Sequence, residues 1–421
     1  MTMQCYPEGC AAGSEAREIA SPSGYAWNVN LNDGNSNRNN QSNHNHVRAV
    51  RAGECRDAVT FRALYLSWRA ARRGKKPSRD QLAFEMDWPD RLIELQDGLN
   101  AGTWRPSPPT CFVQLMPKAR EIHAPAFADR VVHHWLVPQL ERLYEPTFIH
   151  DSYSNRSGKG THAAVRRLRS FVRQVHSGQG RGYYLQLDVR NFFNSIHRRT
   201  LWEILKARMD RAGLSETVQR ATHALLNYPI ERTGVIRACT EAEHAAVPPH
   251  KRLENSAPGY GIAIGNLSSQ FFANVYLDRL DQFVKHRLKA RRYLRYVDDF
   301  VLVHQDRAQL EAWRDEITAF LRADLRLELK ADQKLRPLTA GVDFLGYVIF
   351  PTHSVVRRRV ISHCRAKLAA FERSSDRSDA ALERLRSTWA SYFAHFMHAD
   401  SYRLRVLLFD RFPWLAWTLP Q

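Results

Sequence analysis

Two adjacent acids, Asp298 and Asp299, stand between two runs of aromatic and β-branched residues, and this stretch constrains the fold more than any other. Residues 293–297 and 300–303 each have the composition of a β-strand, so the acids are predicted to lie at the turn of a hairpin. Two carboxylates at a rigid turn repel each other unless a cation lies between them. Magnesium prefers carboxylate oxygens together with substrate phosphates, so the turn is a candidate Mg²⁺ site. Taken alone, the pair is more typical of an acidic turn exposed to water.

A third acid changes that interpretation. Asp188 ends the apolar run 183–187, which is also predicted to be a strand. Enzymes that join nucleotides with two metal ions take carboxylates from separate strands, because the ions clamp both the attacking and the leaving oxygen. Asp188 lies 110 positions before Asp298, so only the fold could bring the two acids together.

The charge of the chain predicts a polyanionic partner. The net charge is +19, and residues 1–54 contribute −1 because they hold four Arg, no Lys and five acids. The rest of the chain therefore carries +20, which favours nucleic acid as the partner. The six cysteines lack metal-like spacing, which indicates a reduced, cytoplasmic protein. No apolar run reaches the length of about 18 residues that crosses a membrane, so no membrane partner is expected.

Four segments, in this order, resemble the motifs of reverse transcriptases. Residues 187–193 resemble motif A, residues 264–270 motif B, residues 296–299 motif C, and residues 344–347 the primer grip. The resemblance covers about residues 55–415. It implies an α+β fold of the right-hand polymerase type, with fingers, a palm made of an antiparallel sheet and helices, and a short helical thumb. It also implies the synthesis of cDNA from dNTPs on an RNA template.

The resemblance assigns roles to residues at matching positions. Asp188, Val189, Asp298 and Asp299 would hold two Mg²⁺ ions, and Lys334 would protonate the leaving pyrophosphate. The dNTP would be bound by Lys118, Arg120, Phe193, Ile264, Gly265, Asn266 and Gln270. Template and primer would be bound by Arg156, Lys159, Arg166, Arg169, Gly346 and Tyr347.

Some of these roles have simpler alternatives. A solvated hairpin turn would explain Lys118 and Arg120 equally, and a solvated helix face would explain the arginines of residues 161–175. Phe193 matches the position that closes against the sugar 2′ carbon and selects dNTPs over NTPs, whereas Phe192 is better explained as a core aromatic.

The motifs also predict a division of the chain. Residues 1–54 are expected to be a disordered, Asn-rich leader, and residues 55–185 the fingers. The palm would span residues 186–350 with an irregular loop at 228–257, and residues 351–421 would form the helical thumb.

Motif B distinguishes subfamilies. Most reverse transcriptases carry Gln-Gly and then Ser-Pro here, whereas this chain has Ile264 before Gly265 and Gln270 after Ser269. This variant resembles the enzymes of diversity-generating retroelements. Loss of the Gln amide would loosen the pocket around the nascent base pair, and discrimination there depends on only a few kcal/mol.

The resemblance to that subfamily implies a role and partners. It implies error-prone cDNA, mutated at template adenines, that diversifies a variable protein gene. It also implies a small, basic, helical accessory protein that forms a pentamer. Two alternatives remain: another bacterial reverse transcriptase, of the group II intron-like or phage-defence kind, and a non-catalytic RNA-binding scaffold.

The leader carries a second signal of the same subfamily. Nine of the eighteen residues 28–45 are Asn. Residues 25–35 and 46–51 resemble the C-terminal end of the C-type-lectin-like variable proteins that such elements diversify. Asn codons are rich in mutable adenine, so we interpret residues 24–51 as a template repeat translated in frame. A plain polar linker is the alternative.

Overall fold

The computed structural model describes residues 58–418 apart from Lys75, Pro117 and 230–233, together with the backbone of three strands nearer the N-terminus. These strands are β1 (Arg17–Ala20), β2 (Tyr25–Val29) and β3 (Ser36–Asn40), which pair as an antiparallel sheet. The three segments are therefore extended rather than unstructured. The other leader residues lie outside the described residues, so the predicted disorder and the translated template repeat stay predictions.

Contacts divide the chain into two compact units. The first unit holds Met1–Pro146 and Ile196–Phe272, and the second holds Thr147–Ser195 and Ala273–Gln421. These units cut across the predicted boundaries at residues 185 and 350. The names fingers, palm and thumb therefore remain predictions for this chain.

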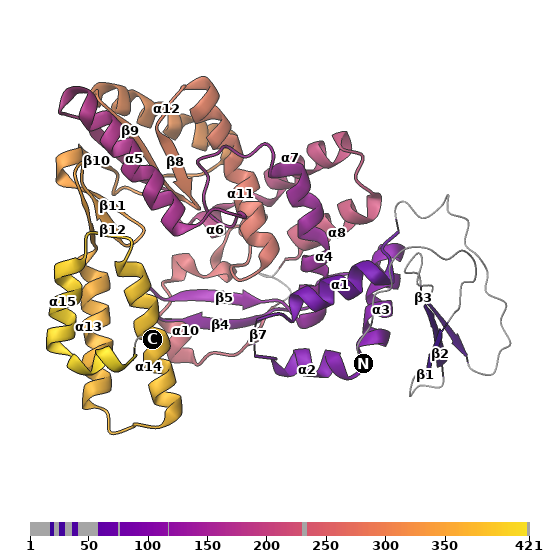
Figure 1. Ribbon diagram of the computed structural model, residues 1–421. Coiled ribbons are helices and arrows are strands. Elements are labelled where there is room, and N and C mark those ends of the chain that lie inside the picture. The colour runs from indigo at the N-terminus through magenta and orange to yellow at the C-terminus, as the bar shows by residue number, and fades with distance from the viewer. Residues whose placement is uncertain are drawn as a thin grey trace, which may run out of the picture. The chain divides into compact units, whose positions relative to one another are not determined.

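The first unit is mainly helical (Figure 1). Its longer helices are α1 (Phe61–Ala71), α2 (Arg79–Met86), α3 (Trp88–Ala101), α4 (Phe127–Tyr144), α7 (Arg198–Arg211) and α8 (Glu216–Asn227). The Thr60 hydroxyl accepts a hydrogen bond from the Ala63 amide and so begins α1, and Gly102 ends α3 in the left-handed conformation. Helix α4 supplies much of the core because most of its length is buried.

A small sheet completes the first unit. Strand β4 (Thr110–Gln114) pairs antiparallel with β5 (Arg120–Ala124) and parallel with β7 (Ile236–Arg237). After β7 come α10 (Glu241–Ala245) and the 3₁₀ turns η1 (Pro249–Lys251) and η2 (Leu253–Asn255). The region 228–257, which was predicted to be an irregular loop, thus contains these short elements. A capping box between Thr240 and Glu243 gives α10 a local cause that the sequence carries.

The second unit is built on a four-stranded antiparallel sheet (Figure 1). The strand order is β10 (Lys334–Pro337), β6 (Tyr183–Asp188), β9 (Asp299–His304) and β8 (Tyr293–Tyr296). Helix α5 (Thr161–Gln179) packs its apolar stripe on Tyr184, Val301 and Val303 of this sheet. Helix α12 (Arg307–Leu325) contacts β6 and β9. Because side chains alternate along a strand, Gln186 and Asp188 lie on the same face of β6 as Tyr184.

The remaining elements follow in chain order. They are α6 (Phe192–Ser195), α11 (Leu267–Gln282), the π-helical turn η3 (Phe283–Arg287) and the 3₁₀ turn η4 (Leu338–Ala340). A three-stranded antiparallel sheet follows, made of β11 (Val342–Phe344), β12 (Tyr347–Ile349) and β13 (Ser354–Val356). Helices α13 (Arg358–Arg373), α14 (Asp379–Phe396) and α15 (Tyr402–Arg411) and turn η5 (Pro413–Thr418) end the described chain.

These C-terminal helices have a core of their own. Trp389, Phe396 and Leu408 are fully buried together with Cys364 and Leu415. The predicted α+β class with antiparallel sheets and a helical C-terminal region is confirmed. Among the described helices, none is both long and apolar enough to cross a membrane.

Candidate active site

The antiparallel register of the second unit brings the three predicted carboxylates to one end of its sheet. Strand β6 ends at Asp188, β9 begins at Asp299, and the two residues are paired across the sheet. Asp298 lies in the turn between β8 and β9, next to Val297. The predicted hairpin is present, with Asp298 at its turn and Asp299 already in the second strand. Residues 110 positions apart thus meet because β6 and β9 are neighbours.

Asp188 and Asp298 form a close acidic pair. Close packing of protein atoms, and then the negative charge of Asp188, raise the pKa of Asp298 above its ordinary range. The Oδ1 atom of Asp188 is buried and has no hydrogen-bond partner among the described residues. The backbone supports the pair, because the Val189 amide donates a 3.4 Å hydrogen bond to the Asp298 carbonyl. Val189 itself is fully buried.

Asp299 is held differently from Asp298. The Nε2 atom of Gln186 donates to both of its carboxylate oxygens, at 3.1 and 3.3 Å, and also to the Asp343 carbonyl at 3.1 Å. Close packing raises the pKa of Asp299 to about 7, against the lowering effect of the Gln186 hydrogen bond. The sequence analysis missed Gln186, although strand alternation places it two residues before Asp188 on the same face.

The sequence analysis also missed Lys330, which pairs with Asp188. Residues 188–190 and 328–330 run beside each other, since the Lys330 amide donates to the Asp188 carbonyl at 2.9 Å and the Arg190 amide donates to the Glu328 carbonyl at 2.8 Å. An isolated bridge joins Val189 to Leu329. This register places the Lys330 ammonium in an ion pair with Oδ2 of Asp188.

The lysine that the sequence singled out lies in a different place. Lys334 begins β10 opposite Gln186, and its charge partly offsets the rise in the pKa of Asp299. Lys330 and Lys334 therefore act on different carboxylates. The direct ion pair to Asp188 belongs to Lys330.

The carboxylates at this end of the sheet have the chemistry to bind a metal cation. Among the described residues, no group of three or more His, Cys, Asp or Glu side chains is arranged as a metal site. Asp188 nevertheless carries an unpartnered buried oxygen beside Asp298, and an ammonium group already neutralises its other oxygen. Asp299 is less suited, because the Gln186 amide binds both of its oxygens. Asp188 and Asp298 are therefore the residues that would hold a metal ion.

The two aromatic residues after Asp188 differ in burial. Phe192 is buried, whereas Phe193 is half-buried and meets Phe192 edge to face at 5.4 Å. Both belong to the short helix α6. Phe193 keeps an accessible ring next to the carboxylates in sequence, while Phe192 belongs to the core.

The other predicted dNTP ligands belong to the first unit, where the structure relates them only to one another. Lys118 and Arg120 are exposed at the turn between β4 and β5. The His123 amide donates a 2.7 Å hydrogen bond to the Ile264 carbonyl, which ties the motif B segment to β5. Gly265 has φ +121°, and a Cβ there would lie 2.8 Å from the Ile122 side chain and 3.1 Å from the His123 carbonyl. Only glycine fits that position.

Motif B continues into α11. The Asn266 Oδ1 atom is buried without a hydrogen-bond partner among the described residues, and Gln270 is exposed in the first turn of the helix. The structure thus places a buried acceptor and an exposed amide within one helical turn.

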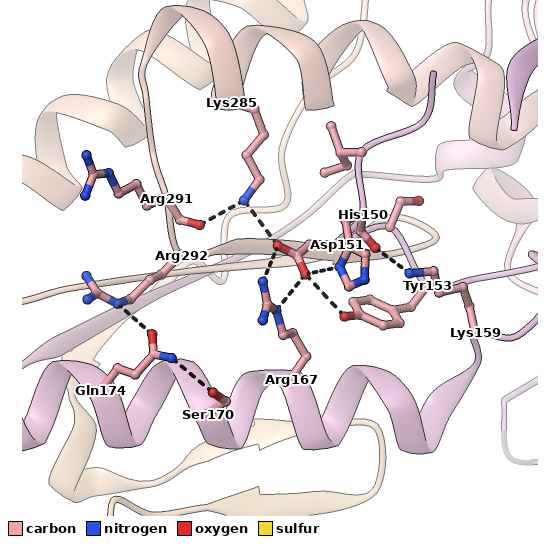
Figure 2. Close-up of polar contacts among 12 residues, drawn as sticks. His150, Asp151, Tyr153, Lys159, Arg167, Ser170, Gln174, Lys285, Arg291 and Arg292 are labelled. Atoms are coloured by element: carbon pink, nitrogen blue, oxygen red, sulfur yellow. Dashed lines mark hydrogen bonds and ion pairs between the residues drawn. The ribbon is translucent and has the colours of Figure 1, made fainter. Parts of the chain in front are cut away.

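Two of the predicted nucleic-acid ligands are engaged inside their own loop. Arg156 donates to the carbonyls of Ile149 and Ser152, at 2.7 and 3.0 Å. The Lys159 ammonium donates to the His150 carbonyl at 2.9 Å (Figure 2). These contacts shape residues 149–160 and give both side chains a structural role that the sequence did not indicate.

The basic face of α5 is more open. Arg166 is exposed, and Arg169 is half-buried with an ion pair to Asp400 at 3.4 Å. Arg166 and Arg169 line two adjoining surface hollows, one of which also includes Arg173. This face stays available to a polyanion.

The Tyr347 side chain, which was predicted to contact nucleic acid, packs inside the protein. It is fully buried, stacks on His395 at 4.2 Å, and donates a 2.9 Å hydrogen bond to the His395 carbonyl. Gly346 has φ +91°, and a Cβ there would lie 2.9 Å from the His395 ring. Gly346 and Tyr347 therefore join β12 to the C-terminal helices.

Comparison with known proteins identifies the class. A family model described as reverse transcriptase (RNA-dependent DNA polymerase) matches residues 113–349, which is more than half of the chain. The chain therefore belongs to the reverse transcriptase family. The predicted enzyme class, an RNA-directed DNA polymerase, is confirmed by this match.

Individual relatives are distant. The chain is 25% identical to the protein YkfC of Escherichia coli K12 over 300 residues, which cover 63% of this chain and 71% of YkfC. It is 20% identical to the group II intron-encoded protein LtrA of Lactococcus lactis subsp. cremoris over 309 residues, covering 62% of this chain and 50% of LtrA. An apo telomerase structure from Candida tropicalis aligns with a TM-score of 0.41 and 12% identity, covering 60% of this chain and 56% of the telomerase. The chain thus spans about half the length of LtrA and of that telomerase.

Proposed function

We propose that this chain synthesises cDNA on an RNA template, with Asp188 and Asp298 as its essential carboxylates. One observation carries the proposal: β6 and β9 are paired so that Asp188 meets the turn that bears Asp298. A dead scaffold has no reason to keep these acids together, because packing and mutual repulsion disfavour their ionised forms. The family match supports the same reaction.

Two Mg²⁺ ions are the cofactor we infer for this site. When bound, they would supply charge for the attacking 3′-oxygen and the leaving phosphate. The residues of the chain would do the rest. Asp188 and Asp298 would hold and orient the ions. Gln186 fixes the Asp299 carboxylate, and Lys330 balances the charge of Asp188. Lys118 and Arg120 at their exposed turn would hold the triphosphate, with Arg bidentate and Lys as a point charge.

We further propose that the enzyme belongs to a diversity-generating retroelement. The argument rests on Ile264 and Gln270 in motif B and on the Asn-rich residues 28–45. The template would then be an RNA that contains the repeat, and the cDNA would carry errors at template adenines. The proposed partner is a small, basic, helical accessory protein that forms a pentamer. The exposed arginine face of α5 would contact nucleic acid.

The test is cDNA synthesis by the purified protein on its own flanking RNA, with and without the neighbouring small helical protein. Products are sequenced and their errors sorted by template base. Errors concentrated at template adenines and abolished by Asp298→Ala would support both parts of the proposal. Faithful cDNA, or errors spread evenly, would instead favour a reverse transcriptase of the kind found with group II introns, such as LtrA, to which this chain is similar.

The scaffold alternative predicts a different result. Tight RNA binding without cDNA under any condition would favour it. An Ile264→Gln variant separates the subfamily from the activity, because restoring the amide should lower misincorporation while leaving cDNA synthesis intact. A variant with the same error spectrum as the native enzyme would remove motif B from the explanation.

A further inference from the structure

The turn that carries Asp298 is held in an unfavourable conformation. Val297 has φ +55°, in the left-handed region. A β-branched side chain adopts this region rarely, because its Cβ crowds the neighbouring carbonyl. A turn of this kind persists only where surrounding contacts fix it.

The contact that fixes it comes from Arg295, whose side chain is completely buried. One guanidinium nitrogen, Nη1, donates a 2.9 Å hydrogen bond to the Val297 carbonyl and a 3.2 Å hydrogen bond to Oδ1 of Asn274. Two other guanidinium nitrogens donate to Asp281, Nε at 2.9 Å and Nη2 at 2.7 Å. Asp281 is itself fully buried. Arginine suits this place because its planar fork can bind a carboxylate and a carbonyl together.

The acid that pairs with Arg295 is fixed from a second side. The Tyr293 hydroxyl donates to Oδ1 of Asp281 at 2.6 Å. Nη2 of Arg295 also donates to the Ser152 hydroxyl at 3.2 Å. The guanidinium therefore cannot rotate away from Val297 without breaking several buried polar contacts.

The backbone of Arg295 is fixed as well. Its amide donates to the Asp151 carbonyl at 2.9 Å, and its carbonyl accepts from the Tyr153 amide at 3.0 Å. Figure 2 shows what holds Asp151: Arg167 of α5 approaches from one side at 2.8 Å and Lys285 from the other at 3.3 Å. This cluster fixes residues 151–153 against β8, and so fixes the strand that leads into the turn.

We propose that Arg295 is a positioning residue for the catalytic acid. By binding the Val297 carbonyl it keeps the left-handed turn closed, and the turn keeps the Asp298 carboxylate beside Asp188. Arg295 acts only through the turn, and its guanidinium is bound to other groups. The inference rests on the proposed function for its catalytic consequence, whereas the link from Arg295 to the turn is a property of the fold.

The test is the variant Arg295→Lys with a second change, Val297→Gly, as a rescue. Lysine keeps the charge next to Asp281 but cannot bind Asp281 and the Val297 carbonyl together. Hydrogen exchange of the amides in residues 293–302 should rise by at least about tenfold in R295K. The kcat for cDNA synthesis should fall by about thirtyfold or more, with KM for dNTP changed less than about threefold. Glycine adopts the left-handed turn without strain, so R295K/V297G should recover kcat to within about fivefold of the native enzyme.

A matched control separates positioning from general stability. Tyr293→Phe removes a different partner of the same Asp281 and leaves the bond from Arg295 to Val297 intact. Any loss of kcat in Y293F should therefore not be rescued by V297G. Equal rescue in both backgrounds, or no rescue in R295K, would overturn the proposal.

Two further arms keep the proposal testable. If R295K does not fold, Asn274→Ala serves instead, because it removes an acceptor that helps to orient the same Nη1 atom of Arg295. Hydrogen exchange at the turn should then rise by a smaller factor. Unchanged exchange in N274A, or in R295K where it folds, would overturn the link to the turn. If the native protein makes no cDNA, the exchange measurement still decides that link, and the failure then belongs to the proposed function.

Discussion

Two hairpin turns of this protein are proposed to serve one reaction, and they are built in opposite ways. The turn between β8 and β9 is fastened at Val297 by a buried arginine network. The turn between β4 and β5 carries exposed side chains at Leu115, Met116 and Lys118. Within the described part of that turn, which leaves out Pro117, the Lys118 side chain makes no hydrogen bond or ion pair.

The difference teaches which task each turn can perform. Carboxylates that hold metal ions must be aligned before the substrate arrives, so the fold accepts strain at Val297 and buries polar groups to maintain it. A basic turn that closes on a triphosphate must instead move, and long exposed side chains keep that freedom. Variants in the turn between β8 and β9 should therefore lower kcat, whereas variants in the turn between β4 and β5 should weaken the affinity for the dNTP.

The largest effect is expected from the fastened turn. Asp298→Asn should lower kcat by at least about a thousandfold, because it removes a carboxylate that would hold the ions that stabilise the negative charge of the transition state. Steady-state cDNA synthesis measures it. The control is Asp315→Asn, which changes an exposed acid on α12. If kcat fell only modestly in D298N, and no more than in D315N, the turn between β8 and β9 would have no part in the chemistry.

Two buried groups, one in each unit, should contribute to stability with opposite dependence on pH. In the second unit, burial raises the pKa of Asp299 to about 7, so the folded state binds this proton more readily than the unfolded chain. The contribution of Asp299 to the stability of the folded state is complete below about pH 4, and it is lost as the pH rises through 7. In the first unit, burial lowers the pKa of His133 to about 3. Because only the unfolded chain then takes up the proton, stability is lost as the pH falls below about 6.5.

Each arm of this pH dependence should reach a few kcal/mol in the free energy of unfolding, since one unit of pKa shift corresponds to about 1.4 kcal/mol. Denaturant unfolding without divalent metal, from about pH 4 to pH 8, measures both arms. Asp299→Asn should reduce the loss of stability as the pH rises towards 7, and His133→Asn should reduce the loss as the pH falls below about 6.5. Asp298 and His123 keep part of each slope, because burial shifts their pKa values in the same directions. If both variants reduced the same slope, the contrast between Asp299 and His133 would fail.

At the exposed turn, Lys118→Ala and Arg120→Ala should each raise KM for dNTP by about tenfold or more, which matches the loss of one charge-assisted hydrogen bond. The change at Arg120 should raise KM more than the change at Lys118, because a guanidinium group can bind phosphate bidentately. The midpoint of thermal unfolding should stay within about 1 °C of the native value, as is usual for exposed positions. A fall in kcat without a change in KM would show that this turn, too, positions the chemistry.

The sequence predicted the fastened turn better than its surroundings, for a physical reason. Strand composition and turn position are local, so residues 293–303 sufficed for the hairpin, and alternation along β6 could also have found Gln186. Lys330 could not be found this way, because its contact with Asp188 depends on a bridge between segments 140 positions apart. The burial of Tyr347 likewise depends on packing against α14, which no local pattern reveals.

The smallest expected effect concerns Lys330, and it would sharpen the account of the fastened turn. Its ion pair with Asp188 is partly exposed, so it contributes at most about 1 kcal/mol. The ammonium occupies a carboxylate oxygen that a metal ion would also use. Lys330→Met should therefore bind Mn²⁺ about two- to fivefold more tightly at pH 8, as measured by calorimetry without nucleic acid.

A second effect of Lys330 opposes the first. The charge of Lys330 also lowers the pKa of Asp298, so its removal favours the protonated acid near neutral pH. At pH 8 the Asp298 carboxylate is ionised, so removal of the competing ammonium decides the affinity, whereas at pH 6 the gain in affinity should shrink. Lys334→Met is the matched control, because Lys334 acts on Asp299 and should leave the affinity unchanged. Unchanged Mn²⁺ affinity with a lower kcat in K330M would instead assign this lysine to proton transfer, the role that the resemblance to reverse transcriptases implied for Lys334.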